Sequence, residues 1–186
     1  MKELFRQLIH LIFGLCIAGM VMAIGRTNSV MVLAGGLFIG IMMVDLILRG
    51  CRVPLFSPLV DAFDRGDCLP GRGALYFAVS GMTCVILFPV TIAVPALVTL
   101  AVLDSVTTMV GVRFGRTRIY NGKSWEGTLA GIVVTVAALL PFLTVPGAVV
   151  VAIVAGVIEL VSPVDDNLVI PVGVCVVLAL VPGFFL

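Results

Sequence analysis

Charged residues are scarce in this sequence. Only 11% of its 186 residues are Asp, Glu, Lys or Arg, whereas 61% are hydrophobic. Charged residues make up about 25% of a typical soluble domain, so the composition excludes an ordinary soluble protein and is typical of a membrane protein. The formal net charge of +1 gives no electrostatic reason to expect a nucleic-acid partner. From the length we expect a single integral membrane domain over residues 1–186.

The sequence also lacks the residue spacings of a thiol metal site. It contains five cysteines and one histidine, but no Cys-x-x-Cys pair and no Cys/His cluster. We therefore interpret the cysteines as small buried or free thiols, and we look for chemistry among the carboxylates and cations.

The hydrophobic residues gather in seven runs that polar residues, Gly or Pro separate. The runs are roughly Phe5–Ile24, Val30–Leu48, Ala74–Phe88, Thr91–Val112, Leu129–Leu143, Ala148–Val161 and Leu168–Leu186. A helix needs about 20 residues to cross about 30 Å of hydrocarbon, and in lipid the backbone must satisfy its own hydrogen bonds. We predict an all-α fold, a polytopic transmembrane helix bundle of about seven spans. Pro89 and the Val145-Pro146-Gly147 stretch predict tight connections.

The cations predict the orientation of these spans. If the N-terminus is cytoplasmic, the outer segments hold only Arg26. The inner segments then hold Lys2, Arg6, Arg49, Arg52, Arg65, Arg72, Arg113, Arg116, Arg118 and Lys123. Such a bias toward the inside is typical of cytoplasmic loops. Most acidic residues fall on the same side, so we expect the active site at the cytoplasmic face.

Asp104 is the acidic residue that packing explains least. It lies within the fourth run, where a carboxylate costs a few kcal/mol on insertion scales and usually faces the bundle interior. Gly111 follows on the same helical face and allows a helix or a ligand to approach closely. The alternative is an ion pair between Asp104 and an arginine that locks two helices together.

The richest polar segment is the loop of residues 115–128. Its glycines can turn backbone N–H groups toward an anion, and its cations can neutralise phosphate charge. The candidate phosphate-binding residues are Gly115, Arg116, Arg118, Gly122, Lys123, Ser124, Gly127 and Thr128. Gly122-Lys123-Ser124 is not a P-loop, because the first glycine of that motif would have to replace Thr117. The alternative is an ordinary cationic loop on the cytoplasmic side.

Two further segments contain candidate site residues. Asp165 and Asp166 precede Asn167 between the last two runs, and hard oxygen ligands of this kind suit Mg²⁺. The alternative is a polar turn that caps a helix. Arg6 and His10 lie one turn apart near the N-terminus, where a histidine is more often an interface residue than a catalyst.

Taken together, these segments resemble the CTP-dependent lipid-alcohol kinases, which include dolichol kinase, phytol kinase and CTP-dependent diacylglycerol kinase. This group lies within the wider cytidylyltransferase-like membrane superfamily. The resemblance covers roughly residues 70–175, and a weaker resemblance extends to Arg6 and His10. It is carried by Asp104, Val110-Gly111, Phe114-Gly115, the segment 122–131 (GKSWEGTLAG), Glu159 and the segment 165–171 (DDNLVIP). The chain lacks the extra amino-terminal spans of the eukaryotic dolichol kinases, which indicates a compact microbial version.

The resemblance implies transfer of the CTP γ-phosphoryl group to the hydroxyl of a membrane lipid alcohol, with Mg²⁺ or a similar divalent cation. A polyprenol or dolichol is the first expectation for the acceptor, and a phytol-like alcohol or diacylglycerol the next. The implied catalytic residues are Asp104, Lys123, Glu126, Asp165 and Asp166, of which Asp104, Asp165 and Asp166 would hold the metal. The implied nucleotide-binding residues are Gly111, Gly115, Arg116, Arg118, Gly122, Lys123, Ser124, Gly127, Thr128 and Asn167. Arg6, His10 and Glu159 are weaker candidates for substrate binding.

Two other functions stay open from the sequence. A cytidylyltransferase that forms a CDP-lipid would use the same nucleotide, but it would attack the α-phosphorus and release pyrophosphate. A small membrane transporter would need polar groups through the membrane. The outer segments contain few such groups, so the sequence favours an enzyme.

Overall fold

A computed structural model describes residues 2–54, 56–63, 70–120 and 122–185. Within these ranges the chain forms seven α-helices, a short 3₁₀ helix and no β-strand, which confirms the predicted all-α class. The helices are α1 Lys2–Leu48, α2 Phe56–Phe63, α3 Arg72–Leu87, α4 Val90–Phe114, α5 Trp125–Leu139, α6 Val145–Val161 and α7 Asp166–Leu180, followed by the 3₁₀ helix η1 Pro182–Phe184.

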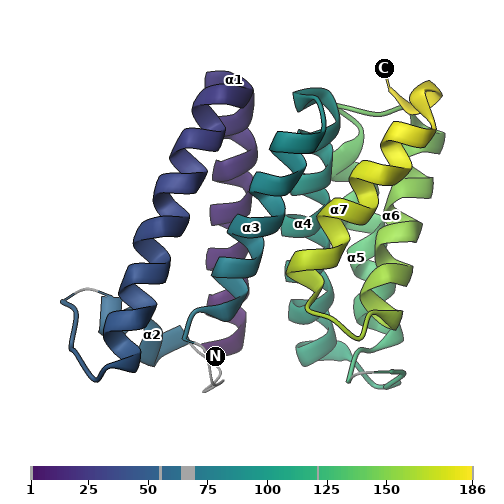
Figure 1. Cartoon of the computed structure of the whole chain (residues 1–186). Coiled ribbons are helices and arrows are strands. Elements are labelled where there is room, and N and C mark those ends of the chain that lie inside the picture. Colours follow the sequence, from purple (N-terminus) through teal and green to yellow (C-terminus); the bar gives the residue numbers. More distant parts are fainter. Residues whose placement is uncertain (1, 55, 64–69, 121, 186) are drawn as a thin grey trace.

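α1 consists of two antiparallel arms. Gly25 interrupts the helical backbone with φ 73° and ψ 179°, a conformation that glycine adopts without the steric cost that a side chain would add. Figure 1 shows the chain rising from the N-terminus, turning at the far end of the bundle and returning toward α2. The Arg26 guanidinium donates a hydrogen bond to the carbonyl of Ile86 and ties this turn to the end of α3. The two arms correspond to the first two apolar runs of the sequence.

α4 lies at the centre of the bundle and packs against α1, α3, α5, α6 and α7. Nearly all of its residues from Ile92 to Thr107 are buried. Its closest neighbour is α5, where glycines face it. A Cβ atom on Gly127 would lie 2.5 Å from the Thr107 carbonyl oxygen, and one on Gly131 would overlap the Thr107 methyl group. These glycines bring the start of α5, and the loop before it, close to α4.

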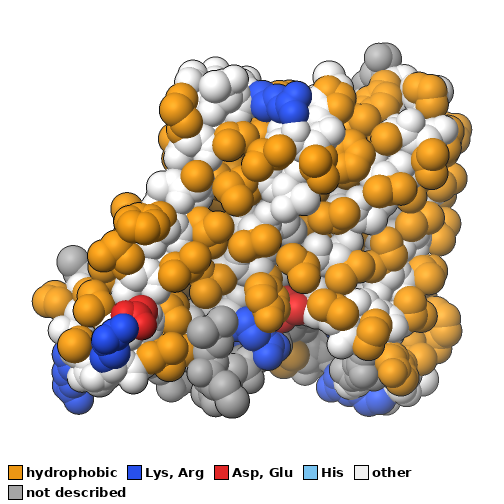
Figure 2. Space-filling view, in the orientation of Figure 1, with side chains coloured by type: hydrophobic (Ala, Val, Ile, Leu, Met, Phe, Trp, Pro, Cys, Tyr) orange, Lys and Arg blue, Asp and Glu red, His pale blue; other side chains and the backbone are white. Residues whose placement is uncertain are grey.

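Within the described ranges, two segments are long and apolar enough to cross a membrane, namely Glu3–Leu48 and Val90–Phe114. α3, α5, α6 and α7 are shorter apolar helices of 15 to 17 residues. Hydrophobic side chains cover most of the face in Figure 2, whereas Lys and Arg gather mainly at the edge where Figure 1 places the N-terminus and α2. On this face the surface is thus apolar along the helices, and its cations lie mainly at one end.

Some connections between the apolar runs differ from the sequence expectation. No apolar run covers the stretch 49–73, but it contains the short helix α2. The Val145-Pro146-Gly147 stretch forms the first turn of α6, and the connection from α5 lies before it. Proline fits this position because the first turn of a helix needs no intrahelical N–H donor.

Candidate functional site

A cavity of about 720 Å³ opens at the end of the bundle that holds the N-terminus. The start of α1, the start of α3, the second half of α4, the loop before α5 and the link between α6 and α7 surround it. Its apolar wall consists of Ile9, Phe13, Phe56, Val60, Phe77 and Val112. The size is that of a small-molecule pocket, and one cavity offers both polar and apolar surface to a ligand.

Most of the residues singled out from the sequence line this cavity, although they come from segments far apart in the chain. They are Arg6, His10, Asp104, Gly111, Arg118, Gly122, Lys123, Ser124, Thr128, Glu159, Asp165, Asp166 and Asn167. Gly115, Arg116, Glu126 and Gly127 do not line it.

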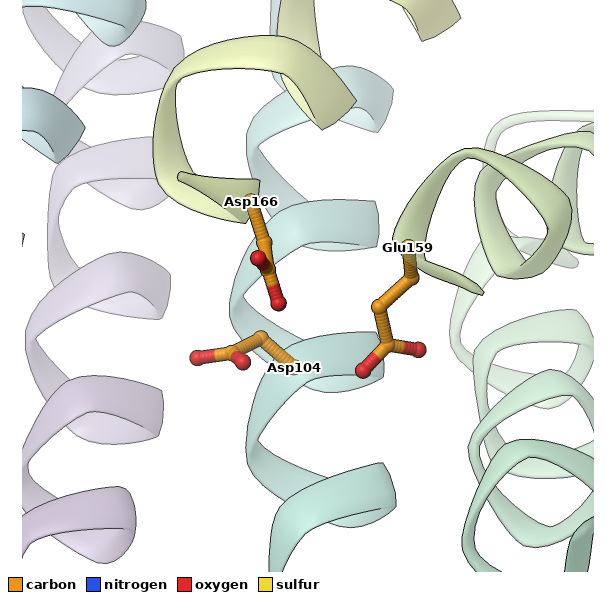
Figure 3. A group of neighbouring side chains, drawn as sticks. All are labelled: Asp104, Glu159 and Asp166. Atoms are coloured by element: carbon orange, nitrogen blue, oxygen red, sulfur yellow. The ribbon is translucent and has the colours of Figure 1, made fainter. Parts of the chain in front are cut away.

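Three carboxylates form the acidic centre of the cavity. Asp104 comes from α4, Glu159 from α6 and Asp166 from the first turn of α7, and one oxygen of each lies within 4.8 Å of the others. Figure 3 shows the Asp166 side chain pointing toward the space between Asp104 and Glu159. We call these three residues the carboxylate cluster. The metal set expected from the resemblance contained Asp165, and the structure groups Glu159 with Asp104 and Asp166 in its place.

The Lys123 ammonium lies against two members of the carboxylate cluster. Its Nζ atom is 2.6 Å from Glu159 Oε1 and 2.5 Å from Asp166 Oδ2. Burial alone would lower the pKa of Lys123, but the attraction of Glu159, Asp166 and Asp104 outweighs it and raises the pKa above its ordinary value. Lys123 therefore stays positively charged and neutralises part of the cluster.

Asp165 has a different environment from its neighbour Asp166. It caps the N-terminus of α7, where its carboxylate accepts hydrogen bonds from the Asn167 backbone N–H at 3.2 Å and from Asn167 Nδ2 at 3.0 Å. Arg72 Nη2 lies 3.4 Å from its other oxygen. The capping turn, kept as an alternative from the sequence, is therefore what Asp165 forms, and the residue orients α7 at the rim of the cavity.

The first arm of α1 contributes His10 and Arg6 to the cavity wall. His10 Nε2 lies 3.6 Å from Asp104 Oδ2, and the His10 ring meets Phe77 edge-on at 5.3 Å between centroids. Arg6 forms an ion pair with Glu3 one turn away at 2.5 Å. His10, one of the two N-terminal residues in the weaker part of the resemblance, thus lies beside Asp104 in space.

The loop before α5 is held in a defined shape. Ile119 N–H donates to the Lys123 carbonyl at 2.9 Å, and Gly122 adopts φ 74° in the turn between them, where a side chain would be strained. Ser124 caps α5 by accepting a hydrogen bond from the Gly127 N–H at 3.2 Å. This hairpin-like loop places Lys123 over the carboxylate cluster.

The candidate residues that do not line the cavity have identifiable contacts elsewhere. A Cβ atom on Gly115 would overlap the Gly111 carbonyl and lie 2.6 Å from Ser124 Oγ. Gly127 faces α4, as described above. The Glu126 carboxylate accepts a hydrogen bond from the Thr117 N–H at 3.2 Å. Gly115, Arg116 and Glu126 line a separate, smaller hollow with Arg113 and Phe114. Packing and loop contacts therefore account for Gly115, Gly127 and Glu126.

The structure adds polar residues that the sequence analysis did not select. The buried Thr107 hydroxyl donates to Glu159 Oε1 at 2.6 Å, and the buried Gln7 side chain lines the cavity. Thr107 follows Asp104 by three residues, so the helical face of Asp104 was the signal that could have found it. Gln7 follows Arg6 directly, and nothing in its spacing distinguishes it.

The carboxylate cluster fits a divalent cation. Three formal negative charges face one ammonium, which leaves an excess of negative charge, and oxygen atoms are the ligands that Mg²⁺ prefers. In addition, Glu159 Oε2 and the Thr128 hydroxyl are buried and have no hydrogen-bond partner within the described residues. Buried polar atoms are normally paired, so a ligand or ordered water is expected beside them.

The chain is similar to an archaeal protein of comparable length. It is 36% identical over 176 residues to the uncharacterized protein MJ1137 of Methanocaldococcus jannaschii, a match that covers 92% of this chain and 90% of the relative. The chain belongs to the family of that protein. No family model and no solved structure gives a significant match. The name of the archaeal relative states no activity, so the function is inferred from the cavity and its residues.

Proposed function

We propose that this protein is a CTP-dependent kinase that transfers the γ-phosphoryl group to the hydroxyl of a membrane lipid alcohol, with a polyprenol or dolichol as the first candidate acceptor. One observation carries the proposal: the separate segments that resemble such kinases converge on one cavity. Asp104, Lys123, Glu159 and Asp166 are up to 62 residues apart in sequence, yet Lys123 contacts two of these carboxylates directly and the third lies beside them.

The residues of the cavity suggest a division of roles. Phosphoryl transfer depends mainly on positioning and on neutralisation of charge. Lys123 and Arg118, both from the loop before α5, line the cavity and would offer positive charge to the phosphates. Asp104, Glu159 and Asp166 would hold a divalent cation, which when bound supplies further charge neutralisation to the phosphates. The apolar wall at Phe13 and Phe56 would accommodate the hydrocarbon part of the acceptor.

We also propose that the protein crosses the membrane seven times with a cytoplasmic N-terminus. The seven apolar runs correspond to the two arms of α1 and to α3, α4, α5, α6 and α7, which we call the seven rods of the bundle; the short helix α2 is not one of them. The chain ends lie at opposite ends of the bundle. The cavity then lies at the cytoplasmic face, where nucleotide is available and where most Lys and Arg residues gather. The exposed apolar side chains along the rods would face lipid.

The proposal is tested by product analysis with purified protein in detergent micelles. CTP and other nucleoside triphosphates would be combined with polyprenol, dolichol, a phytol-like alcohol or diacylglycerol, with Mg²⁺ present. We expect CDP and a lipid phosphate, and loss of both in Asp166→Asn. Pyrophosphate with a CDP-lipid would instead identify a cytidylyltransferase. No nucleotide turnover with any acceptor would contradict the enzymatic assignment.

A further inference from the structure

We propose that the Lys123 ammonium occupies the position that a divalent cation takes at Asp104, Glu159 and Asp166, so that the cation and this lysine contact exclude each other. This inference rests on the proposed function and states how its site is regulated. Without a divalent cation, the Lys123 ammonium neutralises part of the charge of the carboxylate cluster. The cluster binds a divalent cation only when Lys123 leaves Glu159 and Asp166.

The geometry makes the two cations competitors for the same carboxylates. Lys123 Nζ stands 2.6 Å from Glu159 Oε1 and 2.5 Å from Asp166 Oδ2. Mg²⁺ binds oxygen at about 2.0–2.1 Å, so opposite ligands lie about 4.2 Å apart. The three cluster oxygens already lie within 4.8 Å of one another. A small inward movement of the carboxylates would therefore complete a metal site at the place where the ammonium now lies.

The charges around the cavity single out Lys123 for this role. Arg6 is paired with Glu3, and Arg72 lies beside Asp165, outside the cluster. The Arg118 guanidinium donates to the Gly122 carbonyl at 2.5 Å. Lys123 forms ion pairs with Glu159 and Asp166, two of the three members of the carboxylate cluster. Removal of one partner from a buried ion pair is strongly destabilising, so the cluster needs a cation of some kind at this position.

Two buried oxygens indicate that the ammonium does not satisfy the site completely. Glu159 Oε2 and the Thr128 hydroxyl both belong to cavity-lining residues, both residues are at least 98% buried, and neither atom has a hydrogen-bond partner within the described residues. An ammonium offers three donors, whereas a hydrated divalent cation brings several water molecules. Those waters would reach acceptors and hydroxyls that Lys123 leaves without partners.

Lys123 can leave the cluster without a rearrangement of the helices. Its ammonium is a point charge on a flexible four-carbon stem, and the cavity beside it has a volume of about 720 Å³. The loop that carries it is anchored through Ser124 at the start of α5 and turns at Gly122. A rotation of the side chain is therefore enough to move the ammonium from the carboxylates to an anionic group in the cavity.

The test measures Mn²⁺ binding by electron paramagnetic resonance of the free ion, in purified protein without nucleotide. Because the competing charge is lost, we expect Lys123→Met to bind Mn²⁺ at least about tenfold more tightly than the original protein. The matched control is Arg118→Met, which removes the same charge from the same loop and cavity but leaves the cluster contacts intact. It should change Mn²⁺ affinity by less than about threefold. Glu159→Gln added to Lys123→Met should remove the tight binding.

The inference is overturned if folded Lys123→Met binds Mn²⁺ no more tightly than the original protein, or if Arg118→Met tightens binding equally. If Lys123→Met does not fold, Lys123→Gln takes its place, with thermal unfolding as a second measurement. Folding that depends on added Mn²⁺ supports the exchange, whereas failure of both variants to fold with Mn²⁺ contradicts it. If Lys123→Met binds Mn²⁺ more tightly but the original protein transfers no phosphoryl group, the proposed function is wrong and the cation exchange stands. If the original protein transfers a phosphoryl group but Lys123→Met does not bind Mn²⁺ more tightly, the cation exchange is wrong and the proposed function stands.

Discussion

The Thr107 hydroxyl donates a hydrogen bond to Glu159 Oε1 at 2.6 Å, and the same oxygen receives the Lys123 ammonium. Thr107 lies on α4 and Glu159 on α6, so one carboxylate oxygen connects two helices and the loop before α5. Since Thr107 also packs against the glycines of α5, a single buried threonine links helix packing to the carboxylate cluster.

Replacement of Thr107 by valine should therefore weaken both stability and activity. Valine keeps the shape but removes the donor, and a hydrogen bond to a charged group contributes about 1.5–3 kcal/mol. We expect a lower free energy of unfolding by that amount and a roughly tenfold loss of phosphoryl transfer, because Glu159 loses a fixed orientation. Thermal unfolding in detergent and initial rates measure the two effects. Thr107→Ser, which keeps the hydroxyl, is the control and should retain most activity.

Asp165 and Asp166 are adjacent in sequence but should respond differently to the same substitution. Asp166→Asn removes one charge from the carboxylate cluster and weakens the contact with Lys123, so we expect activity to fall by about tenfold or more. Asp165→Asn should cost less, because asparagine caps a helix about as well as aspartate. Rates of both purified variants, compared at equal folded fraction, decide between them. A larger loss in Asp165→Asn would contradict the site described above.

The long helices could be predicted from the sequence because each apolar run must satisfy its own backbone hydrogen bonds and therefore forms a helix. The residues at which these helices begin and end were harder to predict. α5 begins at Trp125 rather than near Leu129, since Ser124 caps it within a polar stretch that carries no hydrophobic signal. α2 was missed because an eight-residue helix between cationic segments lacks a long apolar run.

The candidate site could be predicted only in part, for a physical reason. Asp104 could be selected because a charge within an apolar span is energetically costly. Lys123 could be selected because it lies in a loop rich in glycine and cations. Glu159 looked like the polar end of a span, and its central place follows from the packing of α6 against α4 and α5. Asp165 and Asp166 are indistinguishable in sequence, and only the start of α7 separates a capping carboxylate from one that faces Lys123.

The close contact of α4 and α5 predicts a specific intolerance at Gly131. A Cβ atom there would overlap the Thr107 methyl group and lie 3.2 Å from Leu103 Cδ1, so Gly131→Ala should destabilise the protein by about 1–3 kcal/mol. Gly35→Ala is the matched control: its Cβ atom would meet nothing within 4 Å, and alanine favours the helix. Combining Gly131→Ala with Thr107→Ser, which removes the methyl group, should recover part of the loss. Additive losses in thermal unfolding would disprove the contact.

The proposed orientation predicts which cysteine is accessible from which side. Cys51 is exposed just beyond the second arm of α1, at the cytoplasmic end in our proposal, and Thr27 is exposed at the turn between the two arms. In a variant with Cys51 as its sole cysteine, a membrane-impermeant maleimide should label inside-out vesicles and leave intact cells nearly unlabelled. A sole cysteine introduced by Thr27→Cys should show the reverse pattern, which controls for reagent access and expression.

Because ten of the eleven Lys and Arg residues lie in the segments assigned to the cytoplasm, an inverted result would require the whole cationic face to lie outside. Strong labelling of Cys51 in intact cells would therefore overturn the orientation, and it would move the cavity with Lys123 away from cytoplasmic nucleotide.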